Sequence, residues 1–181
     1  MWIILTLILN HSFAQAFTLP KNLNSQDRKQ VIRILGIPSS SKMLSNPYPL
    51  GGFPGIELGL SYQFVDTEEI SLLGTGLSAK ENLTLTEITF GKGLYNNLDI
   101  FFHLAPFNTS QKINSYGGLL KWGFYQTKFL PIHFSLMLHG STLQIGDSFV
   151  NQTLGAELLA GVNVDNLSIY FGSGQLLAEG E

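Results

Sequence analysis

Residues 91–104 read GKGLYNNLDIFFHL. Two runs in which apolar side chains alternate with small or polar ones meet there at Asn96-Asn97. Alternation with a period of two predicts β-strands, and asparagine tolerates the positive φ angles of a tight hairpin turn. The stretch therefore predicts an antiparallel hairpin with one apolar face and one polar face. A soluble barrel would turn the apolar face inward, whereas a membrane barrel would turn it outward.

The composition restricts the class of protein. The chain has 181 residues, enough for one domain with a core, and its formal net charge of -3 argues against nucleic-acid binding. Without cysteine, the chain cannot form disulfides, thiolate metal sites or a cysteine nucleophile. Charged residues make up 13%, about half of their usual share in a soluble domain, beside 19 glycines and 13 phenylalanines. These values favour a β-protein with a large apolar surface.

The first residues predict export. Residues 2–9 are apolar, and Ala14-Gln15-Ala16 has the small-x-small form of a signal-peptidase site. The apolar run is shorter than the about 20 residues that a helix needs to cross a bilayer, and no lysine or arginine precedes it. We expect a signal peptide at residues 1–16. The alternatives are a short membrane anchor and a buried first strand.

Residues 17–54 predict a short N-terminal helix and a connector. Asn24 or Ser25 can cap the helix, its body QDRKQVIRIL has one apolar face, and Gly36 marks its expected end. The apolar face would either pack against the fold or cap the mouth of a barrel. Residues 37–54 carry Pro, Ser and Gly at many positions and predict an irregular connector.

The period of two continues after Gly55. We expect an antiparallel β-barrel region at residues 55–181, because seven strands follow one another with no helix between them. The strands are predicted at residues 56–65, 83–94, 98–105, 117–126, 132–145, 153–164 and 167–173. A slip in the apolar phase near Leu85–Glu87 suggests a β-bulge in the second of them.

The connections between the predicted strands alternate in length. Longer loops are expected near residues 66–82, 107–115 and 146–151, and short turns at residues 96–97, 127–131 and 165–166. Outer-membrane barrels show this asymmetry between outer loops and periplasmic turns. The apolar face is also nearly free of charge, as lipid requires, because a Lys or Arg at the membrane midplane costs about 2–4 kcal/mol. Both features favour the membrane version of the barrel.

The two faces of the strands define the candidate site residues. The ionisable residues predicted to face the lumen are Glu57, Glu87, Asp99, His103, Lys121, His133, His139 and Glu157. The apolar residues predicted to face lipid are Leu58, Leu60, Ile100, Phe102, Trp122, Phe134 and Leu136. Lys92 is the exception on the apolar face, and it lies near a turn, where a long side chain can reach the interface. The lumen residues would set the ion preference of a pore.

Residues 55–173 resemble Gram-negative outer-membrane β-barrel proteins, in stretches such as ITFGKGLYNNLDIFFH, GGLLKWGFYQTKFLP and TLGAELLAGVNV. The resemblance implies an all-β, antiparallel up-and-down transmembrane barrel in the outer membrane, whose partners are the lipid bilayer and the barrel-assembly machinery. It names an architecture and no chemistry. We therefore expect a passive pore or a structural barrel with a polar lumen, for an unspecified small solute, without cofactor, metal or enzymatic activity.

Two features depart from that family pattern. Such barrels usually close on a strand with a terminal aromatic residue, whereas this chain ends QLLAEGE, and the predicted number of strands is odd. We expect either that residues 66–82 hide a further strand or that the barrel is incomplete and the chain is a fragment of a longer one.

Two other functions are compatible with the residues. A soluble periplasmic barrel like a lipocalin, with an apolar ligand inside, would show the same alternation. An outer-membrane hydrolase could use Ser135 with His133, although no nucleophile motif surrounds this serine. One metal ion cannot bridge His133 and His139 directly, since six residues of strand separate them by about 20 Å.

Overall fold

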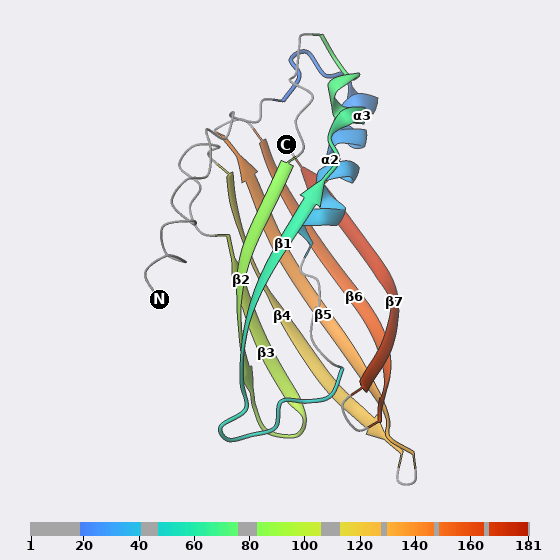
Figure 1. Ribbon diagram of the computed structural model, residues 1–181. Coiled ribbons are helices and arrows are strands. Elements are labelled where there is room, and N and C mark those ends of the chain that lie inside the picture. The colour runs from blue at the N-terminus through green and yellow to red at the C-terminus, as the bar shows by residue number, and fades with distance from the viewer. Residues whose placement is uncertain are drawn as a thin grey trace, which may run out of the picture.

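The computed structural model describes residues 19–40, 47–75, 83–105, 113–127, 130–146, 149–164 and 167–180. Its main element is one antiparallel sheet of seven strands, each paired with its neighbours in sequence. The strands are β1 (Ile56–Val65), β2 (Leu83–Gly93), β3 (Leu98–Leu104), β4 (Ile113–Gln126), β5 (Ile132–Ile145), β6 (Phe149–Val164) and β7 (Leu167–Gly180). The sheet curls into a half-barrel with β1 and β7 as its edges (Figure 1). The predicted all-β, up-and-down architecture is confirmed at this level.

Several strands are longer than predicted. β1 and β5 have the predicted bounds, but β4 begins at Ile113, β6 begins at Phe149 and β7 continues to Gly180. Ile113 and Phe149 are buried on the concave face of the sheet. The inward face of β4 and β6 therefore begins with an apolar residue, where strict alternation predicts a polar one. For this reason the alternation does not extend to the start of either strand.

The register differs from the prediction at two places. The bulge expected near Leu85–Glu87 is wrong, because β1 and β2 pair without a shift along the whole of β1. The apolar phase slips there because Leu85 points inward and joins the buried core. The register shifts instead between Gly123 and Tyr125, where β4 meets β5. Tyr125 consequently pairs with Phe134 and is exposed, although strict alternation assigns it to the polar face.

The longer connections between strands, from β1 to β2 and from β3 to β4, lie at one end of the sheet, and the turn between β2 and β3 lies at the other. The turn between β2 and β3 has positive φ angles of 57° and 59° at Asn96 and Asn97, which confirms the predicted hairpin. The connection from β1 to β2 contains a short helix, α3 (Glu68–Ser71), and residues 76–82 of the expected loop lie outside the described residues. No hidden strand is present in its described part, where Thr75 forms an isolated bridge with Lys21.

The N-terminal helix, α2 (Ser25–Ser39), begins as predicted and ends later. The side chain of Asn24 accepts hydrogen bonds of 2.8 and 2.9 Å from two backbone N–H groups of the first turn. The expected end at Gly36 is wrong, because the helix continues to Ser39. A Cβ atom on Gly36 would lie 2.9 Å from Nδ2 of Asn151 on β6. This glycine therefore allows close packing of the helix on the sheet and does not end the helix.

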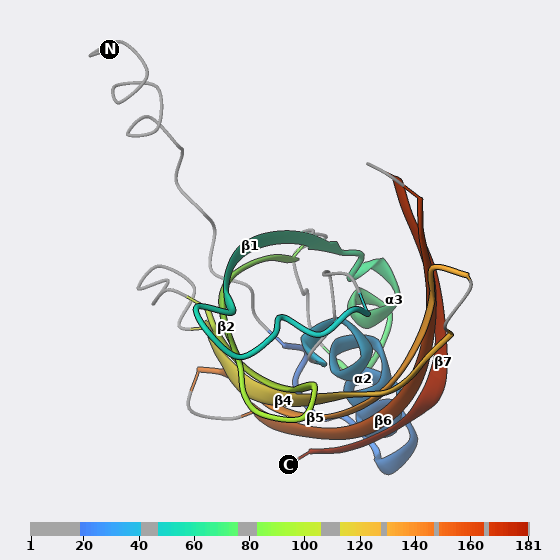
Figure 2. The same ribbon diagram turned by 90° about the horizontal axis from the view of Figure 1, so that it is seen from below.

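α2 lies within the concavity of the sheet, at the end with the longer connections (Figure 2). Its buried residues belong to the main hydrophobic cluster, which consists of Val31, Leu35, Val65, Ile70, Leu83, Leu85, Ile113, Leu143, Ile145 and Phe149. The core thus sits between α2 and the inner surface of the strands at this end. No helix in the described part of the chain is both long and apolar enough to cross a membrane.

The connector between α2 and β1 is irregular over residues 47–55, as predicted. Residues 37–39 belong to α2, which corrects the expected boundary, and residues 41–46 lie outside the described residues. The described part follows the concave face and enters β1 at the end of the sheet that carries the short turns (Figure 1). The predicted signal peptide at residues 1–16 also lies outside the described residues.

Candidate functional site on the concave face

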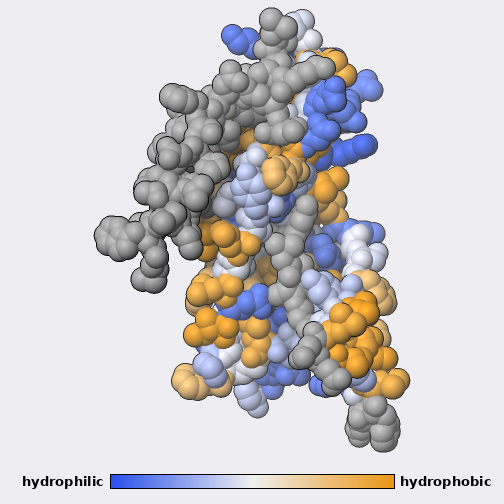
Figure 3. Space-filling view, in the orientation of Figure 1, coloured by the Kyte–Doolittle hydropathy of each residue, from blue (hydrophilic) through white to orange (hydrophobic). Residues whose placement is uncertain are grey.

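The convex face of the sheet carries exposed apolar side chains. The residues predicted to face lipid all lie on it: Leu58, Leu60, Phe102 and Trp122 are exposed, and Ile100, Phe134 and Leu136 are half-buried. Leu58 and Leu60 expose 74% and 75% of their surface. In Figure 3, apolar side chains lie along the strands on both sides of the molecule, and hydrophilic ones lie at the end with α2 and between the two sides.

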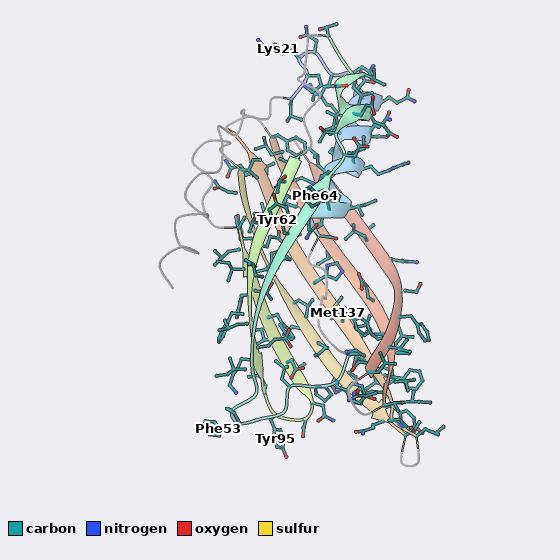
Figure 4. All side chains as sticks on the ribbon, in the orientation of Figure 1. Lys21, Phe53, Tyr62, Phe64, Tyr95 and Met137 are labelled. Carbon is teal, nitrogen blue, oxygen red and sulfur yellow. The ribbon has the colours of Figure 1, made fainter. Side chains whose placement is uncertain are left out.

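Aromatic side chains lie toward both ends of this apolar surface. Phe53 and Tyr95 lie at the end with the short turns and are 98% and 84% exposed (Figure 4). Tyr62 and Phe64 lie closer to α2 on β1, with ring centroids 4.9 Å apart. Trp122 is opposite Leu98, the first residue of β3 after the short turn, and contacts Phe124 on the same strand, with centroids 5.9 Å apart. Phe102 is opposite Gly118 in the middle of β4. The aromatic residues are therefore concentrated near the ends without being confined to them.

The concave face is polar over its middle. The ionisable residues predicted to face a lumen all lie on it: Glu87, Asp99, His103, Lys121, His133 and His139 are buried, and Glu57 and Glu157 are half-buried. Over this part, the polarity of the sheet is thus the reverse of that of a soluble barrel, which buries apolar residues and exposes polar ones. Toward α2 the concave face is apolar and holds the main hydrophobic cluster.

An ion pair between Asp99 of β3 and Lys121 of β4 lies on this face, close to the turn between β2 and β3. The two residues are directly opposite each other in the register, and Nζ of Lys121 lies 3.0 Å from Oδ2 of Asp99. Both side chains are fully buried. Nζ of Lys121 also lies 5.1 Å from the centre of the Phe101 ring. Removing two charges from water is costly, so such a pair is favourable only where further hydrogen bonds complete it.

The connector supplies these further hydrogen bonds. The backbone N–H of Leu50 donates to both carboxylate oxygens of Asp99, at 3.1 and 3.0 Å. Nζ of Lys121 donates to the backbone carbonyl of Tyr48 at 2.8 Å. The side chain of Leu50 packs against a second buried cluster, which consists of Phe101, Leu119, Met137 and Leu159. The ion pair and the connector therefore stabilise each other in place.

Further contacts hold the connector along its length. The hydroxyl of Ser135 donates to the carbonyl of Pro47, and Nζ of Lys92 donates to the carbonyls of Gly52 and Pro54 at 2.6 and 3.0 Å. A Cβ atom on Gly93 would stand 1.8 Å from the carbonyl oxygen of Gly51, so only glycine permits that approach. The described connector is thus bound to β2, β3, β4 and β5.

Glycines on neighbouring strands make room for the larger inward side chains. His103 pairs with Gly117, and His139 pairs with Gly155. A Cβ atom on Gly155 would lie 2.2 Å from Nε2 of His139, and one on Gly117 would lie 2.4 Å from Cε1 of His103. The inner surface of a curved sheet is crowded, so a ring lies across the strand beside it only where that strand lacks a side chain. Part of the high glycine content is explained in this way.

Several of the remaining polar side chains pair across strands. The hydroxyl of Ser115 donates to Oε1 of Glu87 at 2.9 Å, and Nε2 of His139 lies 3.4 Å from Oε1 of Glu157. The hydroxyls of Ser141 and Thr153 also share a hydrogen bond. These contacts link the strands of the concave face to one another.

The concave face shows neither of the chemical sites considered from the sequence. Ser135 donates its hydroxyl proton to Pro47, and within the described chain neither ring nitrogen of His133 has a hydrogen-bond partner. His133 therefore does not activate Ser135 as a base would. No group of three His, Asp or Glu residues among those described is arranged to hold a metal ion. What the arrangement does is bind the connector and α2 inside the curved sheet.

The sequence predicted which ionisable side chains share one face of the sheet. It did not predict that the connector, residues 47–55, would bind to that face. Asp99 and Lys121 have opposite charges and fall on the predicted polar face of consecutive strands, so counting residues from the strand ends could have paired them. No local signal indicated that Tyr48 and Leu50 would complete the pair through their backbone groups. No protein-family model, curated protein or solved structure matches the chain.

Proposed function

We propose that the protein is an outer-membrane β-barrel whose interior is closed by its own N-terminal segment, meaning α2 and residues 47–55. The observation that carries this proposal is the reversed polarity of the sheet. Leu58 and Leu60 are about three-quarters exposed on the convex face, while Asp99 and Lys121 are fully buried on the concave face. The bilayer and the barrel-assembly machinery are the partners that the proposal implies.

The exposed apolar side chains favour lipid over water around the convex face. Moving an exposed Leu or Phe side chain out of water gains about 1.5–3 kcal/mol, and such residues occur on every strand. Strands of about 9–11 residues span the apolar layer of a membrane. β1, with 10 residues, and β2, with 11, have this length, β4 to β7 are longer, and β3, with 7, is shorter. A lipocalin-like barrel would instead present an apolar interior to its ligand, whereas here a buried ion pair lies on the inner face beside the apolar clusters.

The contacts of the connector favour a closed barrel over an open passive pore. Its backbone is hydrogen-bonded to the wall at Asp99, Lys121 and Ser135, where a pore would hold water. α2 fills the concavity at the other end. Solute passage would require displacement of this segment, so we propose a structural or gated barrel.

Fluorescence of Trp122 tests the membrane location. The sequence contains two tryptophans, and the other, Trp2, lies in the predicted signal peptide. We expect brominated lipids to quench Trp122 in the membrane-bound mature protein, because this residue is on the convex face. In the control variant Trp122→Phe with Tyr48→Trp, the tryptophan moves to the concave face, and lipid quenching should be lost. Quenching by aqueous iodide, in a protein released without detergent, would support the soluble alternative instead.

Planar-bilayer recordings of the natural protein test the closed interior separately. A closed barrel should show no steady conductance at low voltage. A continuously open channel would refute the closed interior while leaving the membrane location to the quenching result.

A further inference from the structure

The connector is held inside the sheet by hydrogen bonds and by few apolar side chains. Its backbone forms hydrogen bonds with one polar side chain on each of four strands. Pro47 is fully buried and Leu50 is half-buried, whereas residues 51–54 are exposed. By contrast, α2 buries Val31 and Leu35 in the main hydrophobic cluster. Water can replace a hydrogen bond but not an apolar contact, so displacing the connector should cost less than displacing α2.

The connector can move without leaving an unpaired charge. Nζ of Lys121 lies 3.0 Å from Oδ2 of Asp99, so the two charges contact each other directly. In a hydrated interior, water would replace the two backbone groups of the connector that complete this pair. Gly51 and Gly55 flank the exposed part of the connector and have positive φ angles of 77° and 34°. Hinges often form at small residues such as these.

We propose that the connector is a displaceable gate, and that the passage it closes conducts small cations in preference to anions. The inference rests on the proposed closed barrel, and it adds which segment opens and which class of solute passes. Displacing this part of the N-terminal segment is sufficient for small ions, because α2 remains bound by its apolar face and exposes the polar side chains of Lys29, Gln30 and Arg33.

The charges of the concave face favour cations. Beyond the pair of Asp99 and Lys121, the strands of the described chain carry no lysine or arginine on this face but three carboxylates, Glu57, Glu87 and Glu157. Glu57 interacts electrostatically with Lys121, so an excess carboxylate lies where the connector crosses the sheet. Carboxylates that line a pore favour cations. At the α2 end, four exposed basic residues are offset by four acidic ones: Lys21, Arg28, Lys29, Arg33, Asp27, Asp66, Glu68 and Glu69.

Two glycine variants should open the gate. Gly93→Ala would place a Cβ atom 1.8 Å from the carbonyl oxygen of Gly51, so the connector would have to move away from β2. Gly161→Ala would place one 2.4 Å from Cγ of Pro47 and displace the connector from β6. In planar-bilayer recordings, we expect both variants to show a steady conductance that the natural protein lacks. Quenching of Trp122 by brominated lipids verifies that each variant has inserted.

A third glycine provides the matched control. Gly59 lies on the same face of β1, and a Cβ atom there would meet only Cβ of Thr89, at the ordinary distance of 3.5 Å. Gly59→Ala should therefore stay closed like the natural protein.

Reversal potentials in a gradient of KCl measure the ion preference of the opened protein. At about pH 8, where histidine side chains are mostly uncharged, we expect K⁺ to be more permeant than Cl⁻ through Gly93→Ala. Adding Glu57→Gln should shift the reversal potential toward zero. Adding Glu179→Gln should leave it unchanged, because Glu179 lies exposed on the convex face of β7.

The gate and the ion preference can each be overturned. Conductance through Gly59→Ala would refute the gate, and so would inserted Gly93→Ala and Gly161→Ala proteins that stay closed, or failure of both to insert. Preference for Cl⁻, or no effect of Glu57→Gln, would refute the passage of cations. The proposed function fails on other results: an open channel in the natural protein refutes the closed interior, and absence of lipid quenching of its Trp122 refutes the membrane location.

Discussion

Replacing Lys121 with methionine should destabilise the folded protein by about 3–5 kcal/mol. Methionine retains most of the volume of the lysine stem but removes its charge. Asp99 would then remain fully buried as a carboxylate, with the N–H of Leu50 as its remaining donor among the contacts described above. Removing one partner of a buried ion pair typically costs this amount, because the other charge is left without compensation.

The double variant makes the prediction specific to the pair. Asp99→Leu alone should also cost about 3–5 kcal/mol, because it leaves the buried Lys121 ammonium without its carboxylate. Asp99→Leu with Lys121→Met removes both charges and should cost no more than either single change. Independent sites would instead give a sum of about 6–10 kcal/mol. The interaction energy in this cycle should therefore be several kcal/mol.

Denaturant unfolding of the natural protein in lipid vesicles, followed through Trp122 fluorescence, measures these differences. Glu179→Gln is the control, because Glu179 is an exposed carboxylate on β7, away from the ion pair, and it should change the stability by less than about 1 kcal/mol. A stability of Lys121→Met within about 1 kcal/mol of the wild type would contradict this prediction, and so would two single effects that simply add.

Three further changes probe the packing and the two faces. Gly155→Ala would place its Cβ 2.2 Å from Nε2 of His139, so the free energy of unfolding should fall by about 1–3 kcal/mol in denaturation curves. The additional change His139→Ala should restore part of this stability. Phe102→Lys introduces a charge on the convex face and should cost about 2–4 kcal/mol and increase extraction by carbonate, whereas Tyr95→Lys at the turn should have little effect. Leu35→Ala removes a buried side chain of α2 and should cost about 2–5 kcal/mol in the same unfolding assay, unless the helix contributes little to the core.

The sequence was sufficient for features that depend on neighbouring residues. Asn96 and Asn97 determine a tight turn through their own φ angles, and Asn24 caps α2 through the N–H groups of the next turn. β1 has a clean alternation over its whole length, so its bounds and its two faces could be predicted. These features require no knowledge of distant parts of the chain.

The sequence was insufficient where distant segments meet. Gly36 looks like a helix end, but contact with Asn151 explains it, and that contact exists only after the sheet has formed around the helix. Leu85 interrupts the polar phase because α2 and its neighbours cover that part of the concave face. The sequence of the connector predicts only an irregular linker. Leu50 binds Asp99 through its backbone N–H, and this contact cannot be predicted from the type of residue.

The contacts of the connector also bear on how strands are aligned during assembly. Its backbone meets one polar side chain from each consecutive strand: Lys92 of β2, Asp99 of β3, Lys121 of β4 and Ser135 of β5. A slip of one residue in a hairpin turns every side chain of the strand to the opposite face, so the misaligned strand would lose its contact. The connector precedes all these strands in the chain and is available while each hairpin forms. Correct alignment is thereby favoured by a single internal segment before the sheet is complete.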